Sequence, residues 1–202
     1  MREVRPLKYK ELEGLSEKQL KEHHDVLYAG YVKKIDEIED KLKKVDLASA
    51  NATYSDLREL KMEETFALNG VRLHEGYFDN MGPRLSTGSG PSGKILEMIE
   101  RDFGSYENWE KEFKALGLSA RGWVVLGYDL EDKKLKNVLC DSHNQGGVWD
   151  MLSLLIMDVY EHAYFIDYAT GRKAYIEAFF KNINWQYVDQ RISEYSLFFL
   201  KK

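Results

Sequence analysis

Apolar residues recur at helical spacing through the first quarter of the chain. In the segment SEKQLKEHHDVLYAGYVKKIDEIEDKLKKV, residues 16–45, the apolar positions three or four apart are Leu27, Tyr31, Ile35, Ile38, Leu42 and Val45. This spacing is typical of one face of an amphipathic helix, and Ser16 with Gln19 has the form of a capping box at its start. A second helical pattern begins near Ser55. The two patterns together predict an antiparallel helical hairpin.

The pattern changes after this hairpin. Gly, Pro and Ser dominate the stretch MGPRLSTGSGPSG, Met81 to Gly93, which we interpret as a linker. We therefore expect two domains, an N-terminal helical hairpin over residues 1–85 and a C-terminal α/β domain over residues 92–202.

The C-terminal part combines helical and strand patterns. The segment KILEMIERDFGSYENWEKEFKALGL predicts two helices broken at Gly104, with Ser105 as an N-cap. GWVVLGYDL and KLKNVLCD flank the polar turn EDKK, which predicts a β-hairpin, and the apolar run Met151–Met157 predicts a third, buried strand. RKAYIEAFFKNI and WQYVDQRISEY return to helical character. The predicted fold class is α+β and mostly helical.

Composition narrows the class of protein. The 202 residues are 44% apolar and 13% aromatic, as in a globular chain. No window approaches 18 consecutive apolar residues, and MREVRPLKYK at the start lacks a signal-type apolar stretch, so we expect a cytoplasmic protein without a membrane span. The net charge of -5 and the lack of a basic stripe argue against a nucleic-acid partner. The single cysteine, Cys140, excludes an internal disulfide framework and a multi-thiolate metal site.

Histidines and one carboxylate form the candidate chemistry. The apolar run before Asp158 should be buried, and a buried carboxylate is costly unless it has a partner. His162 follows four residues later, while His23 opens the first long helix and His74 ends the second, so a hairpin brings these two helix ends together. Three imidazoles and one carboxylate suit a first-row transition metal, whereas Mg or Ca would take mostly oxygen ligands. A metal would then be the partner of Asp158.

A simpler interpretation uses the same residues. Asp158 could cap the element that follows it, with His162 packed against an aromatic neighbour. Spacing alone does not separate the two interpretations, and it leaves Glu161 without a role.

Longer motifs carry a family resemblance. DVYEHAY, Asp158 to Tyr164, resembles the D-x-W-E-H-A-[FY] signature of the iron/manganese superoxide dismutase family, and GWVVLGY, RDFGSYENW and NINWQYV match in order and spacing. The resemblance runs from PLKYKELEGLSEKQLKEHH to INWQYVDQRI. It implies an N-terminal helical hairpin, and a C-terminal domain of helices around a three-stranded antiparallel sheet. The implied reaction converts superoxide to dioxygen and hydrogen peroxide at one manganese or iron ion per subunit.

The resemblance also implies residue roles. The four metal ligands would be His23, His74, Asp158 and His162. Tyr31 matches the gateway tyrosine of the family, and Trp123 matches an aromatic wall of its cavity. In the family, the glutamate equivalent to Glu161 reaches across a dimer interface to the metal-binding histidine of the other subunit. We therefore expect a homodimer or homotetramer.

Several positions depart from the family pattern. Leu27 and Phe165 replace a histidine and a tyrosine that usually pair across the interface, so neither leaves a polar group without its partner. Tyr160 stands for the signature tryptophan, and Phe78 for a tryptophan four residues after the second ligand. These changes bear on rate and product inhibition more than on the reaction.

The residues near the second ligand do not distinguish iron from manganese. Gly70, four residues before it, is the manganese-type choice, where iron-type members often have glutamine. Something from the sheet domain should fill the space, and DSHNQGG offers His143 or Gln145. We expect His143, fifteen residues before Asp158, to be the hydrogen-bond partner of the metal-bound solvent. Family members with histidine there include iron and dual-metal enzymes.

Charge bears on the substrate, because superoxide is a small anion and the chain is negative overall. Local positive charge should therefore steer it, and Lys33, Lys34 and Arg172 are the candidates. The alternative function is a non-catalytic binding or scaffold subunit with the same fold. The two are separated by whether the ligands are present, and all four are.

Overall fold

The structure is a computed structural model that describes residues 2–83 and 90–199, with side chains to residue 195. Its elements in chain order are α1 (Glu17–Lys21), η1 (Glu22–Tyr28), α2 (Ala29–Leu42), η2 (Leu47–Ser49), α3 (Asp56–Asp79), α5 (Gly93–Phe103), α6 (Tyr106–Ser119), β1 (Trp123–Asp129), β2 (Lys134–Cys140), β3 (Met151–Asp158), η3 (Glu161–Ala163), α7 (Phe165–Tyr168), α8 (Arg172–Lys181) and α9 (Trp185–Phe199). The α+β, mostly helical class is confirmed.

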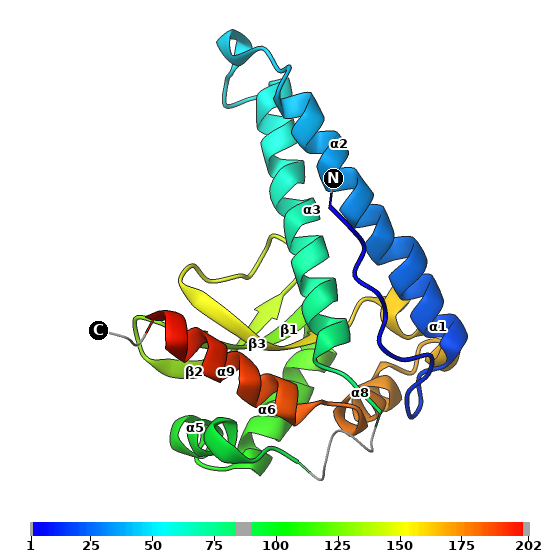
Figure 1. Cartoon of the computed structure of the whole chain (residues 1–202), viewed down its shortest axis with the longest axis vertical. Coiled ribbons are helices and arrows are strands. Elements are labelled where there is room, and N and C mark those ends of the chain that lie inside the picture. Colours follow the sequence, from blue (N-terminus) through cyan, green and yellow to red (C-terminus); the bar gives the residue numbers. More distant parts are fainter. Residues whose placement is uncertain (1, 84–89, 200–202) are drawn as a thin grey trace.

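The predicted helical hairpin is present. Helices α2 and α3 lie antiparallel and extend well beyond the rest of the molecule (Figure 1). Ser16 and Ser55 cap the two helical runs, since each side-chain oxygen accepts a hydrogen bond from a backbone N–H three residues later. Both helical runs of the hairpin therefore begin where their capping residues predict.

The apolar face of the first run differs from the prediction at both ends. Helix α1 passes into α2 through the π-helical segment η1, which takes more residues per turn than an α-helix and so rotates the face that follows. Leu27 is consequently 37% exposed while Tyr28 is buried. Helix α2 ends at Leu42, before Val45.

The C-terminal part contains the predicted three-stranded antiparallel sheet, in the order β2-β1-β3. Its register places Trp123 at the start of β1 beside Cys140 on one neighbour and Asp158 on the other. Helix α6 contacts β1 and β2, while α3 and α9 contact β3. Strand β3 thus lies along the lower half of α3, which brings the end of the sheet to the hairpin (Figure 1).

The predicted break between the helices α5 and α6 is confirmed. Gly104 ends α5 with φ +84°, a conformation that favours glycine, and Ser105 Oγ accepts a hydrogen bond from Asn108 N at 3.2 Å. Residues 84–89 of the predicted linker lie outside the described residues. Just before them, Met81 is buried and forms an isolated β-bridge with Ile183.

One hydrophobic core joins the helical hairpin to the sheet region, with buried members from Tyr9 to Ile192. A smaller cluster of Ile35, Ile38 and Ala67 lies within the hairpin itself. None of the helices in the described ranges is both long enough and apolar enough to cross a membrane. The division into two domains stays a prediction.

Asn80, directly after α3, joins the hairpin to the sheet. Its fully buried side chain donates to Tyr77 O at 3.1 Å and accepts from Ile156 N at 2.7 Å. Because β3 is an edge strand, the outward N–H of Ile156 has no neighbouring strand to bind. Asn80 satisfies that N–H and holds the strand that ends in Asp158 against α3.

Asn80→Ala should lower the free energy of unfolding by about 1–3 kcal/mol, because Ile156 N would remain buried without an acceptor. Urea unfolding of native and variant protein measures the difference. Gln190→Ala, which removes an exposed amide, should change it by less than about 0.5 kcal/mol. Equal effects of the two substitutions would contradict the role given to Asn80.

Candidate metal centre

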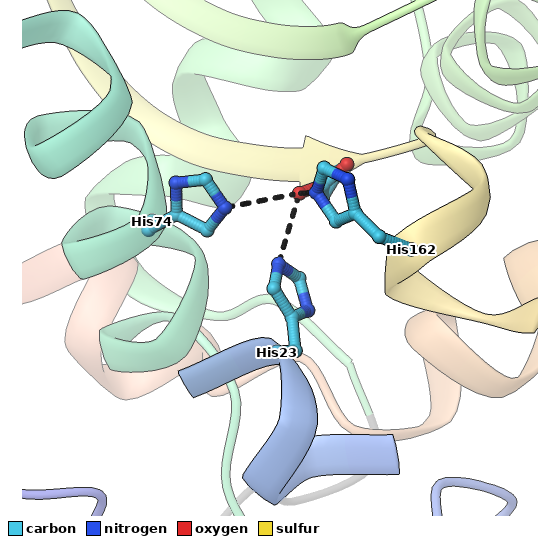
Figure 2. A group of neighbouring side chains, drawn as sticks. His23, His74 and His162 are labelled. Atoms are coloured by element: carbon cyan, nitrogen blue, oxygen red, sulfur yellow. Dashed lines mark hydrogen bonds and ion pairs between the residues drawn. The ribbon is translucent and has the colours of Figure 1, made fainter. Parts of the chain in front are cut away.

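Four side chains from three separate parts of the chain meet where the hairpin contacts the sheet. His23 lies on η1, His74 on α3, Asp158 at the end of β3 and His162 on η3. Figure 2 shows the three imidazoles pointing toward one carboxylate. His23, His74 and Asp158 are at most 1% exposed, whereas the His162 side chain is 27% exposed. Residues 23 and 74 meet because the hairpin is antiparallel, as the sequence predicts.

One carboxylate oxygen is the focus of this group. Asp158 Oδ2 lies 3.1 Å from His23 Nε2, 3.2 Å from His162 Nε2 and 3.7 Å from His74 Nε2. The other oxygen, Oδ1, accepts from Tyr160 N at 2.9 Å. Behind the carboxylate, Tyr175 donates its hydroxyl to Asp158 O at 2.6 Å. The carboxylate is therefore held from the backbone side and directs Oδ2 at the imidazoles.

Three buried ring nitrogens of His23 and His74 have no hydrogen-bond partner among the described residues. His74 Nδ1 donates to Gly70 O at 2.6 Å, because a carbonyl can only accept, so Nε2 of the neutral ring is a bare acceptor facing the carboxylate. Both nitrogens of His23 are buried without a hydrogen bond, and its 3.1 Å approach to Asp158 lacks hydrogen-bond geometry. Two acceptors that face each other in a buried site repel, and a cation between them would satisfy both.

Electrostatics favour an ionised carboxylate and neutral rings for His23 and His74. Burial would raise the pKa of Asp158, but the adjacent His162 and His23 outweigh it and hold that pKa well below its usual range. Burial lowers the pKa of His23 and, together with the nearby His23 ring, that of His74. Burial also opposes the charged form of His162, but Asp158 raises its pKa. A metal ion needs deprotonated ligands, and Asp158, His23 and His74 are held in that form.

The four donors fit one metal ion. Their ligand atoms all lie within 4.8 Å of one another. Ligands at about 2.1 Å on opposite sides of an ion are about 4 Å apart, so the group needs to close only slightly. Three nitrogens and one carboxylate oxygen match a first-row transition metal better than Mg or Ca. His24 is unlike the four, because its nitrogens already bind Asp25 Oδ1 at 2.7 Å and Arg5 O at 2.8 Å.

His143 lies beside this group, where the sequence leads us to expect it. A Cβ atom on Gly70 would approach His143 Cδ2 at 3.2 Å and the Tyr31 ring at 3.1 Å, so these two side chains fill the space that glycine leaves. Trp123 Nε1 donates to His143 Nδ1 at 2.9 Å. The proton of neutral His143 is therefore on Nε2, and burial lowers its pKa to about 4, which keeps the ring neutral.

Aromatic rings enclose the rest of the site. Tyr31 contacts the rings of His74 and His143, with centroids 5.5 Å and 4.9 Å away. Trp123 is fully buried with its ring edge-on to His74, and Tyr160 stacks on His162. Tyr31, Trp123 and Tyr160 therefore all lie against the imidazoles of the four-donor group.

Other predicted residues lie away from the four donors. Gln145 is exposed, whereas His143 is 5% exposed. Glu161 is also exposed in the single chain. Arg172 donates to Ala120 O at 2.8 Å and to Tyr164 OH at 3.1 Å, which joins α8 to the end of α6. Lys33 and Lys34 are exposed on α2, and Lys34 forms an ion pair with Glu37.

Sequence reasoning missed three contacts of the site. Phe66 lies with its ring centroid 4.4 Å from that of His143, and its spacing of four from Gly70 and eight from His74 was a usable signal. Tyr175 had no such signal, because it lies 17 residues after Asp158 on a different element and only the folded chain brings the two together. Gln19 was interpreted as half of a capping box, but its side chain binds His162 O instead, which corrects that prediction.

Comparison with known proteins agrees with the resemblance. Residues 91–191 match the family described as "Iron/manganese superoxide dismutases, C-terminal domain". The chain is 42% identical over 192 residues to a superoxide dismutase [Fe] of Aquifex aeolicus, covering 93% of this chain and 89% of that protein. It is 36% identical over 192 residues to a superoxide dismutase [Fe] of Methanothermobacter marburgensis, covering 94% of each.

A relative named for the other metal is similar to nearly the same extent. The chain is 37% identical over 195 residues to a superoxide dismutase [Mn] of Haloarcula marismortui, covering 94% of this chain and 90% of that protein. Such identity over nearly the whole length, together with the family match, identifies this chain as a member of the iron/manganese superoxide dismutase family.

Proposed function

We propose that His23, His74, Asp158 and His162 hold the one iron or manganese ion with which this superoxide dismutase converts superoxide to dioxygen and hydrogen peroxide. The observation that carries the assignment is the convergence of three imidazole Nε2 atoms on Asp158 Oδ2, with His74 Nε2 facing it as a bare acceptor. A metal cation satisfies all four donors at once. The same convergence argues against the alternative of a non-catalytic scaffold subunit.

The bound metal would supply the redox chemistry, taking an electron from one superoxide and giving one to a second as its oxidation state alternates between three and two. Two protons are also needed, since two superoxide ions give one dioxygen and one hydrogen peroxide. The chain's own part is to exclude bulk water and hold proton donors beside the ion.

Tyr31 and His143 are the proposed proton-holding residues. Burial, and then the charge of Asp158, raises the pKa of Tyr31, so its hydroxyl stays protonated at neutral pH and can donate a hydrogen bond. Trp123 donates to Nδ1 of His143, so the proton of the neutral His143 ring is on Nε2, which can act as a donor. Tyr31 and His143 contact each other edge-on, so they form one wall of the site on the side of Gly70.

The assignment of the metal stays between iron and manganese. Gly70 leaves room that His143 fills. The family resemblance associates Gly70 with manganese-type members, and a histidine at position 143 with members that include iron and dual-metal enzymes. The similar relatives are named for either metal. Zinc is excluded by the reaction, because it has no accessible redox chemistry.

We also propose that two copies of the chain complete the site. The His162 side chain is 27% exposed, unlike the other three ligands, and its neighbour Glu161 is exposed too. Val26 and Leu27 lie on η1, which carries His23, and Phe165 and Ile166 lie on α7, directly after the η3 segment that carries His162. All four are exposed large apolar residues. A second copy would cover them and bring its Glu161 to His162, a carboxylate contact that fixes a ligand imidazole.

A cytoplasmic location and superoxide steering by surface lysines complete the proposal. The lone Cys140 is consistent with a reducing compartment. For steering, Lys34 follows Tyr31 by three residues on α2 and so lies on a neighbouring face of the helix. The hydrogen bonds of Arg172 to Ala120 O and Tyr164 OH support a structural role for it instead.

Removing a ligand should remove the metal. His74→Ala and Asp158→Ala should each yield protein with little iron or manganese and no dismutase activity, as measured by metal analysis and superoxide consumption. His24→Ala is the matched control, because His24 is also a buried histidine but binds Asp25 and Arg5, and this variant should keep its metal. Full metal occupancy in both ligand variants would refute the assignment.

Removing His143 should slow turnover without removing the metal. His143→Ala loses the donor beside the ion, so we expect turnover to fall about 10- to 100-fold with metal content unchanged. Gln145→Ala, at an exposed position two residues away, should change little. A damaging Gln145→Ala with a near-neutral His143→Ala would reverse the two roles.

The chain should be at least a dimer at micromolar concentration, as measured by sedimentation velocity. Leu27→Asp places a charge within the exposed apolar residues and should shift the protein toward monomer. Leu118→Asp makes the same change on an exposed leucine of α6 and should not. A native protein that sediments as a fully active monomer would contradict the proposal.

A further inference from the structure

Gln19 is a buried polar residue that the ligand assignment leaves without a role. It is 1% exposed and lies on α1, one turn before His23. Its Nε2 donates to His162 O at 2.6 Å, and its Oε1 accepts from Ile166 N at 3.0 Å. One side chain therefore binds both ends of the short segment that begins with the ligand His162.

The chemistry of these contacts requires an amide. A backbone carbonyl can only accept and a backbone N–H can only donate, so a single orientation of the Gln19 amide satisfies both partners. In a capping box this side chain would instead bind the N–H of Ser16. That N–H donates to Asp167 Oδ2 at 2.7 Å, which leaves the amide of Gln19 for His162 and Ile166.

The segment that Gln19 binds has little structure of its own. Elements η3 and α7 are 3 and 4 residues long, and helices so short are unstable without tertiary contacts. His162 is also the least buried of the four donors. Its backbone therefore depends on outside contacts, and Gln19 contributes one directly at the His162 carbonyl.

Gln19 also shares its helical run with another ligand. His23 follows four residues later, and the His23 and His162 rings lie with centroids 4.9 Å apart. We infer that Gln19 is a positioning residue that fixes the backbone of His162 relative to His23 and thereby sets the affinity of the site for its metal. This inference rests on the proposal that both histidines are ligands.

The test measures metal affinity rather than activity. Manganese-loaded protein is titrated with a chelator of known affinity to give the dissociation constant. Gln19→Leu removes both hydrogen bonds, and Gln19→Glu keeps an acceptor for Ile166 N while placing an oxygen against His162 O. Each should bind manganese about 10- to 100-fold more weakly than the native chain, the usual effect of losing a contact that orients a ligand.

Ser16→Ala is the matched control. It removes the cap hydrogen bond of the same helix, from Gln19 N to Ser16 Oγ at 3.1 Å, without touching His162. It should lower thermal stability yet keep the native affinity and the native Mn(II) electron paramagnetic resonance spectrum, which reports the arrangement of ligands. The Gln19 variants should change that spectrum.

Two outcomes would overturn the inference alone. One is native manganese affinity and an unchanged spectrum in both Gln19 variants, and the other is an equal loss of affinity in Ser16→Ala, which would mark a general effect of helix stability. His162→Ala separates these outcomes from failure of the proposed function. If it binds manganese as the native chain does, His162 is not a ligand and the assignment of the site fails together with the inference.

Discussion

The burial of the Asp158 carboxylate is the constraint on which the rest of the site depends. It is 0% exposed and faces three imidazoles, of which His74 has its only proton committed to Gly70 O. Burying a carboxylate is strongly unfavourable unless its partners compensate for it, and the bare acceptor His74 Nε2 that faces Oδ2 does not. A metal cation does, so folding and metal binding are coupled at this point.

The fold can be understood as the means of placing that carboxylate. The antiparallel hairpin brings His23 and His74 together, and contact between α3 and β3 delivers Asp158 to them. Asn80 satisfies the outward N–H of the edge strand at Ile156, two residues before the carboxylate. Trp123, the register partner of Asp158 on β1, donates a hydrogen bond to His143 and so fixes that ring relative to the sheet. Together these contacts fix the helices and the strand that carry His23, His74 and Asp158, and the ring of His143.

Local patterns in the sequence predicted much of this arrangement, and the remainder depends on contacts between distant segments. Helical spacing and capping residues located the hairpin, and the whole-chain resemblance located the four donors. The π-helical segment that exposes Leu27 has no signature in the apolar spacing. Gln19 fitted a local capping box, but its partners lie 143 and 147 residues away, where no local pattern could indicate them. Burial favours His143 over Gln145 as the residue beside the metal, because His143 is 5% exposed and Gln145 is exposed.

The most direct test of the account is anomalous X-ray diffraction from crystals of the protein grown with manganese or iron, recorded at the absorption edge of each metal. The account predicts one anomalous peak per chain, in bonding contact with His23, His74, Asp158 and His162. A crystal with no anomalous peak among these four side chains, or with the bound metal elsewhere on the chain, would contradict it.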